Sequence, residues 1–290
     1  MPRLKFAGKL IDARIELDPT SRFRAHLLNP RGVRRFESCD TIVRRSNAIE
    51  LPDGERIPIL YEDRSTLAID KPRGWMLVPF SWQRTDRNLQ AALTSSIAAG
   101  DFWARSRNLK FLRYVHRLDA DTTGILLFAR SRGAVETYSQ LFETRRMRKS
   151  YLAVVEGTPS QKEWTCRLPI GPEPGRPGKM KIDNRHGKSA ETAFRVLRSQ
   201  NGRALVEASP YTGRTHQIRL HLAAARFPVL GDELYGDARA AEVRLALRAT
   251  LLAYVDPFTK RRVEIRAPAG PFLTEFGFSD ADLPASDEHF

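Results

Sequence analysis

Three short segments of the sequence place reactive or anion-binding side chains next to a turn. Residues 115–124 read VHRLDADTTG and hold an imidazole, a guanidinium and two carboxylates in a polar loop. Residues 145–151 read RRMRKSY, and residues 211–222 read YTGRTHQIRLHL. Loops at the ends of buried strands are where rigid scaffolds hold functional groups. Taken singly, each segment also has an ordinary structural explanation. The first could be a helix cap with surface ion pairs, the second a strand edge and the third a solvated helix end.

A metal site is the first alternative, because the histidines and aspartates of these segments are possible ligands: His116, Asp119, Asp121, His216 and His221. On a helix, His216 and His221 would lie about 140° apart, whereas chelating pairs are spaced four residues apart on one face. The chain also lacks a Gly-x-Ser-x-Gly elbow and the glycine-rich loops that cradle nucleotide phosphates. We therefore expect neither a metal nor a cofactor.

The charge of the chain indicates a polyanionic partner. The net charge is +14 and the isoelectric point is about 10.2, so a positive field surrounds the protein at physiological pH. Arginine, which supplies most of this charge, suits bidentate contacts with phosphate and stacking on bases. Charge alone favours a nucleic acid and leaves an anionic membrane surface or an acidic protein as alternatives.

The composition excludes several classes of protein. No stretch approaches the roughly 20 apolar residues of a membrane-spanning helix. The first residues lack the apolar segment and cleavage site of a secretory signal, which makes the cytoplasm the expected location. The two cysteines, Cys39 and Cys166, fit neither a disulfide framework nor a cysteine zinc site.

The elements that must position the three segments mix strands and helices irregularly. Apolar runs predict strands at 67–70, 124–129 and 151–155, the second of them buried on both faces. Apolar residues three and four apart predict a helix through Val135, Tyr138, Leu141 and Phe142, and another in which Ile218 and Leu222 face the core. This pattern favours an α+β fold over a doubly wound parallel sheet.

We expect three parts along the chain. Residues 1–55 are rich in arginine and read as a small β-rich extension, in which no known RNA-binding module is recognisable. Residues 56–278 read as one compact domain of mixed strands and helices. Residues 279–290 hold four acidic residues and no lysine or arginine, which predicts a disordered acidic tail.

The three segments occur together and in order, and in this they resemble the RluA-type pseudouridine synthases. His-Arg-Leu-Asp-x-x-Thr-x-Gly at 116–124 resembles the catalytic signature of that family. Lys149-x-Tyr151 and the Gly-Arg-Thr-His-Gln-Ile-Arg run at 213–219 resemble its second and third motifs. Asp-Lys-Pro-x-Gly at 70–74 and Gly-Asp-x-x-Tyr-Gly at 231–236 are also family-like. The resemblance runs from about residue 60 to residue 271.

The resemblance implies a fold, a reaction and roles for particular residues. The fold would be a single catalytic domain on a mixed, largely antiparallel sheet flanked by helices and loops. The reaction would convert uridine in RNA to pseudouridine, with the Asp119 carboxylate acting as nucleophile or as base on a flipped-out nucleotide. Tyr151 would stack on the uracil, and Arg214 would pair with Asp119. Arg117 and Lys149 would bind the RNA backbone; His116 lies beside them, and we favour a structural role for it.

Two other functions stay open at this point. A non-catalytic RNA-binding protein on the same fold would share the charge and the motifs. A metal-dependent nuclease would require a divalent ion and would tolerate loss of Tyr151. The sequence identifies neither the RNA, ribosomal or transfer, nor the uridine. We expect a monomer that needs no protein partner and no membrane.

Overall fold

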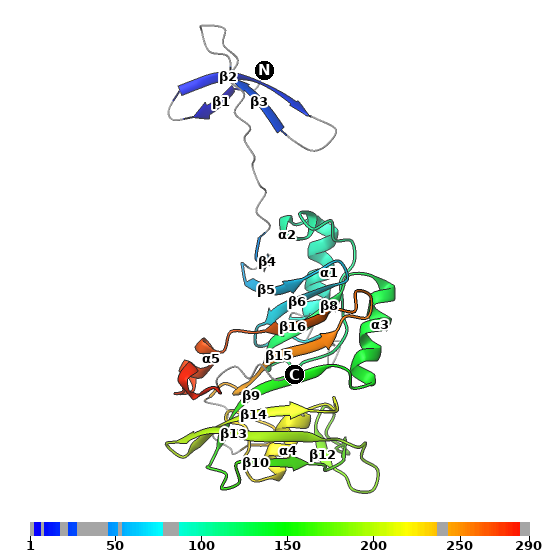
Figure 1. Cartoon of the computed structure of the whole chain (residues 1–290), viewed down its shortest axis with the longest axis vertical. Helices are drawn as coiled ribbons and strands as arrows, with labels where there is room; N and C mark the ends of the chain where they lie inside the picture. Colours follow the sequence, from blue (N-terminus) through cyan, green and yellow to red (C-terminus); the bar gives the residue numbers. More distant parts are fainter. Residues whose placement is uncertain are drawn as a thin grey trace. The chain divides into compact units, whose positions relative to one another are not determined.

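The computed structural model divides into two units, residues 1–45 and residues 46–290. It describes three strands of the first unit and residues 46–51, 54–77, 87–236 and 243–284 of the second. In the first unit, β1 (Arg3–Phe6), β2 (Lys9–Leu17) and β3 (Phe23–Leu27) form an antiparallel sheet (Figure 1). These three strands lie within residues 1–55, where a small β-rich extension was expected.

The second unit contains one large sheet. Among the described residues, eleven strands form this sheet, and its main path runs β10-β13-β14-β9-β15-β8-β6-β5-β4, with β16 beside β15 and β7 beside β8. Only β15 and β8 run parallel among the strand pairs of this described sheet. The predicted α+β fold on a mixed, largely antiparallel sheet is therefore confirmed. The strands are β4 (Ala48–Glu50), β5 (Arg56–Glu62), β6 (Thr66–Lys71), β7 (Arg113–Tyr114), β8 (Thr123–Ala129), β9 (Arg148–Glu156), β10 (Glu163–Cys166), β13 (Thr192–Gln200), β14 (Arg203–Pro210), β15 (Leu247–Val255) and β16 (Arg262–Arg266).

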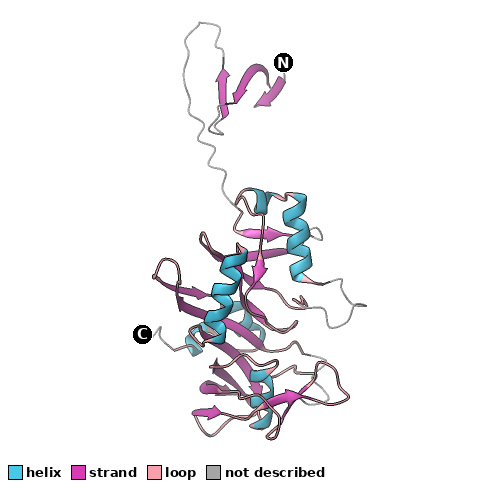
Figure 2. Ribbon diagram, turned by 90° about the vertical axis from the view of Figure 1, so that its right-hand side faces the viewer, coloured by secondary structure: helices cyan, strands magenta, loops and turns pink. Residues whose placement is uncertain are grey.

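Few helices accompany this sheet. Figures 1 and 2 show α1 near β5 and β6 and α3 beside β8, and α4 lies against β12, β13 and β14. The predicted helix through Tyr138 and Leu141 is α3, and the Ser131 hydroxyl caps it by accepting from the Ala134 N–H. The elements are α1 (Leu89–Ala99), α2 (Phe102–Arg105), α3 (Arg132–Glu143), α4 (Gln217–Ala224), α5 (Gly270–Glu275), β11 (Ile170–Pro172) and β12 (Met180–Ile182).

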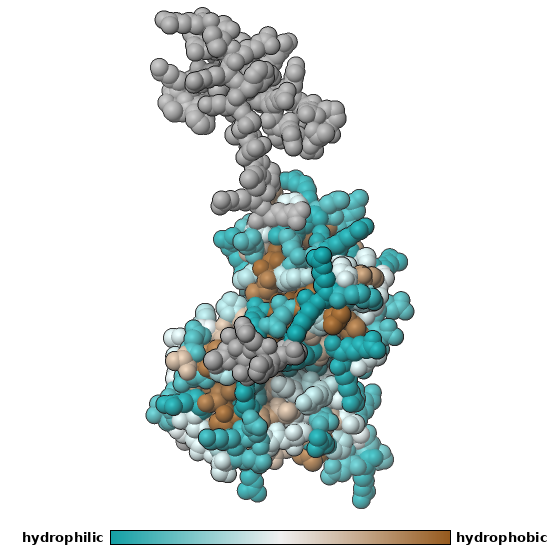
Figure 3. Space-filling view, viewed as in Figure 1, coloured by the Kyte–Doolittle hydropathy of each residue, from teal (hydrophilic) through white to brown (hydrophobic). Residues whose placement is uncertain are grey.

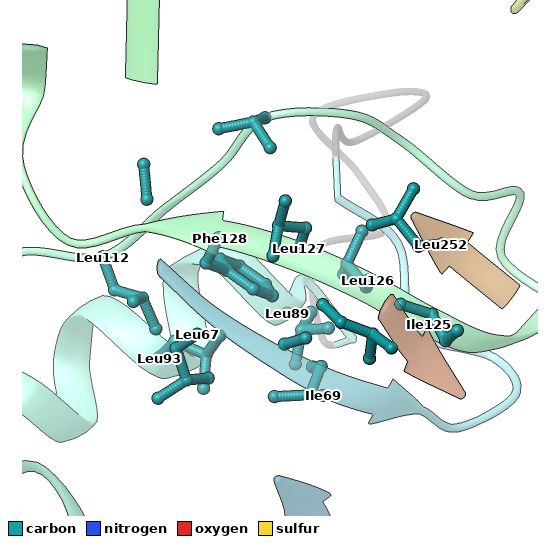
Figure 4. Close-up of a cluster of buried hydrophobic side chains, with 14 of the residues drawn as sticks. Leu67, Ile69, Leu89, Leu93, Leu112, Ile125, Leu126, Leu127, Phe128 and Leu252 are labelled. Atoms are coloured by element: carbon teal, nitrogen blue, oxygen red, sulfur yellow. The ribbon is translucent and has the colours of Figure 1, made fainter. Parts of the chain in front are cut away.

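The core is built around β8, which is buried on both faces as predicted. From Gly124 to Ala129 every residue of this strand is buried. On one side, Leu89 and Leu93 of α1 pack toward Leu67 of β6 and Phe128 of β8 (Figure 4). Burial of each such side chain contributes roughly 1.5–3 kcal/mol, so this region is a rigid support for the loop that precedes β8.

That loop, residues 115–122, is fastened to the end of β6 by a buried lysine. The Lys71 ammonium donates to the carbonyl oxygens of Pro72 at 2.9 Å, Ala120 at 2.6 Å and Thr122 at 3.1 Å. The Gly74 N–H also donates to the Ala120 carbonyl, at 2.9 Å. Burial lowers the Lys71 pKa from 10.5 to about 8. The Lys71 side chain therefore holds two carbonyl groups of the loop that contains Asp119, and ties them to the Pro72 carbonyl next to β6.

The second residue of β8 is a glycine, at the point where the backbones of β8 and β15 approach each other closely. Gly124 lies opposite Ala249 in the parallel pairing of β8 with β15. Its φ is +103°, and a Cβ built there would lie 2.1 Å from the Ala249 carbonyl oxygen. No other residue fits without displacing β15, because a side chain would both clash and adopt an unfavourable backbone conformation.

The two ends of the second unit differ from the expected boundaries. β4 pairs with β5, so residues 48–50 belong to the sheet of this unit, ahead of the boundary at residue 55 that we expected. Ser279–Leu283 form a short 3-10 turn, η2 (Asp280–Asp282), with a capping box between Ser279 and Asp282. Disorder was therefore the wrong prediction for this part of the tail; residues 285–290 lie outside the described residues.

In the described chain, no helix is long and apolar enough to cross a bilayer.

We expect Gly124→Ala to lower the free energy of unfolding by at least about 3 kcal/mol, because it adds both strain and overpacking. Urea denaturation followed by circular dichroism measures this loss. The matched control is Gly100→Ala at the end of α1, where φ is +73° but a Cβ would meet no atom within 4 Å. Its cost should stay near 1 kcal/mol. Equal losses in the two variants would contradict the close approach of β8 and β15.

Lys71→Met should change how stability depends on pH. The Lys71 pKa is about 8 in the folded protein and 10.5 in the unfolded chain, so the unfolded chain binds more protons in that window. The contribution of Lys71 to the free energy of unfolding therefore rises with pH between about 8 and 10.5, by up to about 3 kcal/mol. Urea unfolding of both proteins at several pH values measures it, since every other titrating group is shared. A stability difference that stays constant across this window would disprove the shift.

Candidate active site

The Asp119 carboxylate lies between the loop that precedes β8 and the first turn of α4. Its Oδ2 accepts a hydrogen bond from Arg219 Nη1 at 3.2 Å. Its Oδ1 faces His216 Nε2 at 3.9 Å, which is too long for a hydrogen bond. The side chain is 18% exposed. Asp119 is thus held at one oxygen and reachable from solvent.

A second carboxylate anchors Arg219. Arg219 Nε and Nη2 donate to the two oxygens of Asp232, both at 2.7 Å, and Asp232 is fully buried. Asp232 Oδ1 also accepts from the backbone N–H groups of Leu234 at 3.0 Å and Tyr235 at 3.1 Å. Burial lowers the Arg219 pKa, but the hydrogen bonds and charge of Asp232, with Asp119, outweigh it and leave that pKa raised. The guanidinium is therefore permanently charged and fixed in orientation.

The prediction that Arg214 pairs with Asp119 is wrong in this structure. Arg214 Nε donates instead to the Ser189 carbonyl oxygen at 3.0 Å, and Arg219 occupies the place expected for it. The physical reason is the position of each residue relative to α4. Arg214 precedes the helix, whereas Arg219 lies inside it, three residues before Leu222 on the face that packs against the core.

The turn before α4 is held by one side-chain amide. Gln217 Oε1 accepts from the Thr212 hydroxyl at 2.6 Å and from the Arg214 N–H at 3.0 Å. Gln217 Nε2 donates to the Glu191 carbonyl and to the Thr192 hydroxyl, both at 2.9 Å. All four hydrogen-bonding positions of the amide are thereby used, so residues 212–217 have little freedom to move relative to β13.

His216 and Tyr235 form a polar chain behind Asp119. His216 Nδ1 lies 2.9 Å from the Tyr235 hydroxyl, which accepts from the Met180 N–H at 2.9 Å. Burial lowers the His216 pKa, although Asp119 opposes this effect. The Arg219 guanidinium lies over the Tyr235 ring, 5.3 Å from its centroid. Asp119, α4 and the start of β12 are therefore connected through neighbouring polar groups.

Asp119 lies where two cavities meet. The larger, of about 770 Å³, lies toward the loop between β11 and β12 and includes Arg73, Arg176 and Lys179 in its wall. The smaller, of about 430 Å³, is lined by the predicted site residues: His116, Arg117, Lys149, Tyr151 and Arg214. Arg117, His216 and Arg219 border both. The structure thus gathers all six predicted residues around one space, although only Asp119 contacts the buried arginine.

The smaller cavity combines an aromatic wall with unpaired positive charge. Tyr151 of β9 and Leu247 of β15 supply apolar surface, and burial raises the Tyr151 pKa, so its hydroxyl stays protonated. Four cations of its wall, Arg117, Arg145, Lys149 and Arg214, make no ion pair with a described acidic residue. Lys149 Nζ donates to the Thr212 carbonyl at 3.3 Å, and burial lowers its pKa to about 8. This arrangement suits a planar ring attached to phosphates.

His116 is part of the scaffold. Its Nε2 accepts from the Leu127 N–H at 3.0 Å, and its ring stacks on Phe142 with centroids 4.5 Å apart. Burial, followed by the nearby Lys149 charge, lowers the His116 pKa to about 3. A neutral imidazole that accepts a backbone hydrogen bond keeps the loop in register with β8.

The sequence did not predict the contacts that several residues of the site make; Arg219, as an arginine of the third motif, was expected to bind RNA phosphates. Arg219, Asp232, Tyr235 and Lys71 all lie in segments whose patterns were noticed, but their contacts were not foreseen. A buried-face position within a helix is unusual for arginine, and this signal could have identified Arg219. In the described residues, no group of three or more His, Cys, Asp or Glu side chains is arranged to hold a metal ion. His221, a possible ligand in the sequence, bonds instead to Thr192 and to the Leu168 carbonyl.

Comparisons with known proteins agree with this geometry. A family model described as RNA pseudouridylate synthase matches residues 65–224. The dual-specificity RNA pseudouridine synthase RluA of Escherichia coli (strain K12) is 32% identical over 222 residues, which are 75% of this chain and 95% of that protein. The protein of the same name from Yersinia pestis is 34% identical over 69% of this chain and 92% of its own length.

A solved structure supports the same assignment. Human RNA pseudouridylate synthase domain containing 1 superimposes with a TM-score of 0.61 and 29% identity, over 80% of this chain and 92% of that one. The family match spans the loop of Asp119, the Tyr151 strand and all of α4. The chain belongs to the RluA-type RNA pseudouridine synthases.

Proposed function

We propose that this RNA pseudouridine synthase uses the Asp119 carboxylate to isomerise a uridine that has been flipped into the smaller cavity. The observation that carries the proposal is the position of Asp119. Its carboxylate is partly exposed where the two cavities meet, and it is hydrogen-bonded to a buried arginine. A carboxylate held in this way can act on the ribose or the base as nucleophile, or remove a sugar proton.

The reaction needs no external atoms. The bond from ribose C1′ to uracil N1 breaks, the ring turns, and a bond from C1′ to C5 forms. C5 loses its proton and N1 gains one, so uridine and pseudouridine have the same composition. No oxidant, reductant or cofactor is required, and the work of the protein is to hold the ring and supply the carboxylate.

The wall of the smaller cavity accounts for binding of the nucleotide. Flipping the target out of its stack costs a few kcal/mol. Stacking on Tyr151 offsets this cost by roughly 1–3 kcal/mol, with Leu247 of the same cavity adding apolar contact. Arg117, Lys149 and Arg214 contribute positive charge that binds the flanking phosphates. Such contacts position the RNA but do not read its sequence.

The substrate is proposed to be structured RNA, ribosomal or transfer. The Escherichia coli relative is named a dual-specificity enzyme, and the charge of +14 suits a large polyanion. Hydrophilic side chains cover most of the face drawn in Figure 3, with smaller apolar areas between them. We propose a cytoplasmic enzyme that works as a monomer.

Loss of the Asp119 carboxylate should abolish the reaction. The test is pseudouridine mapping of total RNA from cells that lack this gene, rescued with the wild-type gene or with Asp119→Ala. We expect wild type alone to restore modification at one or a few uridines. Release of tritium from RNA labelled at uracil C5 gives the same reading in vitro, because C5 loses its hydrogen. Full rescue by Asp119→Ala would leave an RNA-binding protein without catalysis as the better account.

The two arginines near α4 should respond differently to substitution by lysine. Arg219→Lys has a single nitrogen and cannot reproduce the two parallel hydrogen bonds to Asp232 together with the one to Asp119, so we expect kcat to fall by ~10²-fold through misplacement of the carboxylate. Arg214→Lys keeps a positive charge at the cavity wall, and its effect should fall mainly on KM. Steady-state tritium release measures both constants. A large loss of kcat in Arg214→Lys with little loss in Arg219→Lys would reverse this assignment.

A further inference from the structure

His216 stands between Asp119 and Tyr235 because its backbone adopts an unusual conformation. Its φ is 55° and its ψ is 21°, in the left-handed region, at the N-cap of α4. Such a conformation is uncommon for a residue other than glycine and costs of order 1–3 kcal/mol. It directs one ring nitrogen toward the Tyr235 hydroxyl, at 2.9 Å, and the other toward Asp119 Oδ1, at 3.9 Å.

The hydrogen bonds of Tyr235 favour one tautomer of His216. The Tyr235 oxygen accepts from the Met180 N–H at 2.9 Å, and its own proton needs an acceptor. Among the described residues, His216 Nδ1 is the acceptor within reach. Burial raises the Tyr235 pKa, so the phenol keeps this proton. If Nδ1–H donated instead, the phenol proton would have no described protein acceptor.

We propose that Tyr235 is a positioning residue that fixes His216 as the Nε2–H tautomer and so makes it a neutral hydrogen-bond donor to Asp119. The Nε2–H then points at Oδ1, while Arg219 already holds Oδ2 at 3.2 Å. This donor role requires the distance of 3.9 Å to shorten to hydrogen-bond length when RNA binds. A carboxylate oxygen has two lone-pair directions, so Oδ1 accepts from His216 and still reacts through the other.

The surrounding charges favour the neutral ring. The charged groups that act on His216 or on its tyrosine partner are Asp119 and Arg117 from the loop, Arg219 of α4, Asp232 of the following turn and Lys179 before β12. Asp232 is already satisfied by Arg219 and two backbone N–H groups. Desolvation of the ring lowers the His216 pKa by more than the attraction of Asp119 raises it. The Asp119 charge is also partly neutralised by Arg219. An imidazolium would also leave the Tyr235 proton without its acceptor.

The first test reads the tautomer directly and needs no RNA. In the uniformly ¹⁵N-labelled full-length protein, two-bond ¹H–¹⁵N correlations separate Nε2–H, Nδ1–H and doubly protonated imidazoles, and His216→Gln assigns the signal. We expect Nε2–H at pH 7 in wild type and a mixture of tautomers in Tyr235→Phe. Nδ1–H or an imidazolium in wild type would overturn the proposal without any variant having to fold.

The second test measures the consequence for catalysis and rests on the proposed function. Tyr235→Phe should lower kcat about tenfold, as the loss of one oriented hydrogen bond would, with KM changed less than about twofold. His216→Gln, which keeps an N–H donor at the same reach, should retain more kcat than His216→Ala. The control is Tyr61→Phe on β5, which loses a hydroxyl bonded to Asp63 at 2.9 Å and should change neither kcat nor the His216 signal.

The outcomes separate the two ideas. If wild type modifies RNA but Tyr235→Phe leaves kcat and the tautomer unchanged, the role of Tyr235 is refuted and the proposed function stands. A shifted tautomer with unchanged kcat refutes the donor role of His216 in the same way. If wild type shows the Nε2–H tautomer but modifies no uridine, the proposed function fails while the tautomer assignment holds.

Discussion

The buried pair of Arg219 and Asp232 is the interaction on which the rest of the site depends. Both groups are withdrawn from water, which is costly for charges unless each is fully hydrogen-bonded. Here two parallel hydrogen bonds at 2.7 Å and two backbone N–H groups satisfy Asp232 completely. One guanidinium nitrogen is left to hold Asp119. Removal of either partner would leave an unpaired buried charge, so this pair specifies one geometry for the carboxylate.

The sheet supplies the frame in which this pair can act. Asp119 precedes β8 and Arg219 lies in α4, a hundred residues later. The strand β15 joins the two halves, because it pairs in parallel with β8 on one side and antiparallel with β9 on the other. The bare backbone of Gly124 lets β8 approach β15, and the Lys71 ammonium gathers the carbonyls of the loop. The placement of Asp119 next to Arg219 therefore depends on the pairing of strands across the whole sheet.

Positive charges in the protein fall into two groups with different environments. Arg219 and Lys71 are buried and donate their hydrogen bonds to groups of the protein itself, and these bonds fix the shape of the site. Arg117 and Lys149 lie at the wall of the smaller cavity without an acidic partner among the described residues. Burial of the first group, with its hydrogen bonds to the protein, makes it sensitive to substitution, whereas the second group borders the cavity in which we propose that the nucleotide binds. This division explains how a basic protein keeps one carboxylate at its centre.

Neighbouring residues alone were enough to predict the protein family, the strand of Gly124 to Ala129, the helix of Tyr138 and Asp119 as the central carboxylate. These follow from local periodicity and from short motifs, which are properties of neighbouring residues. The partner of Asp119, the hydrogen bonds of Lys71 to the loop carbonyls and the contacts of His216 with Tyr235 became visible only in the folded protein. Each joins segments far apart in the chain, and several arginines of similar charge compete for each acceptor. Arg219 bonds to Asp119 because it lies on the buried face of α4, whereas Arg214 lies in the turn before that helix and bonds to Ser189.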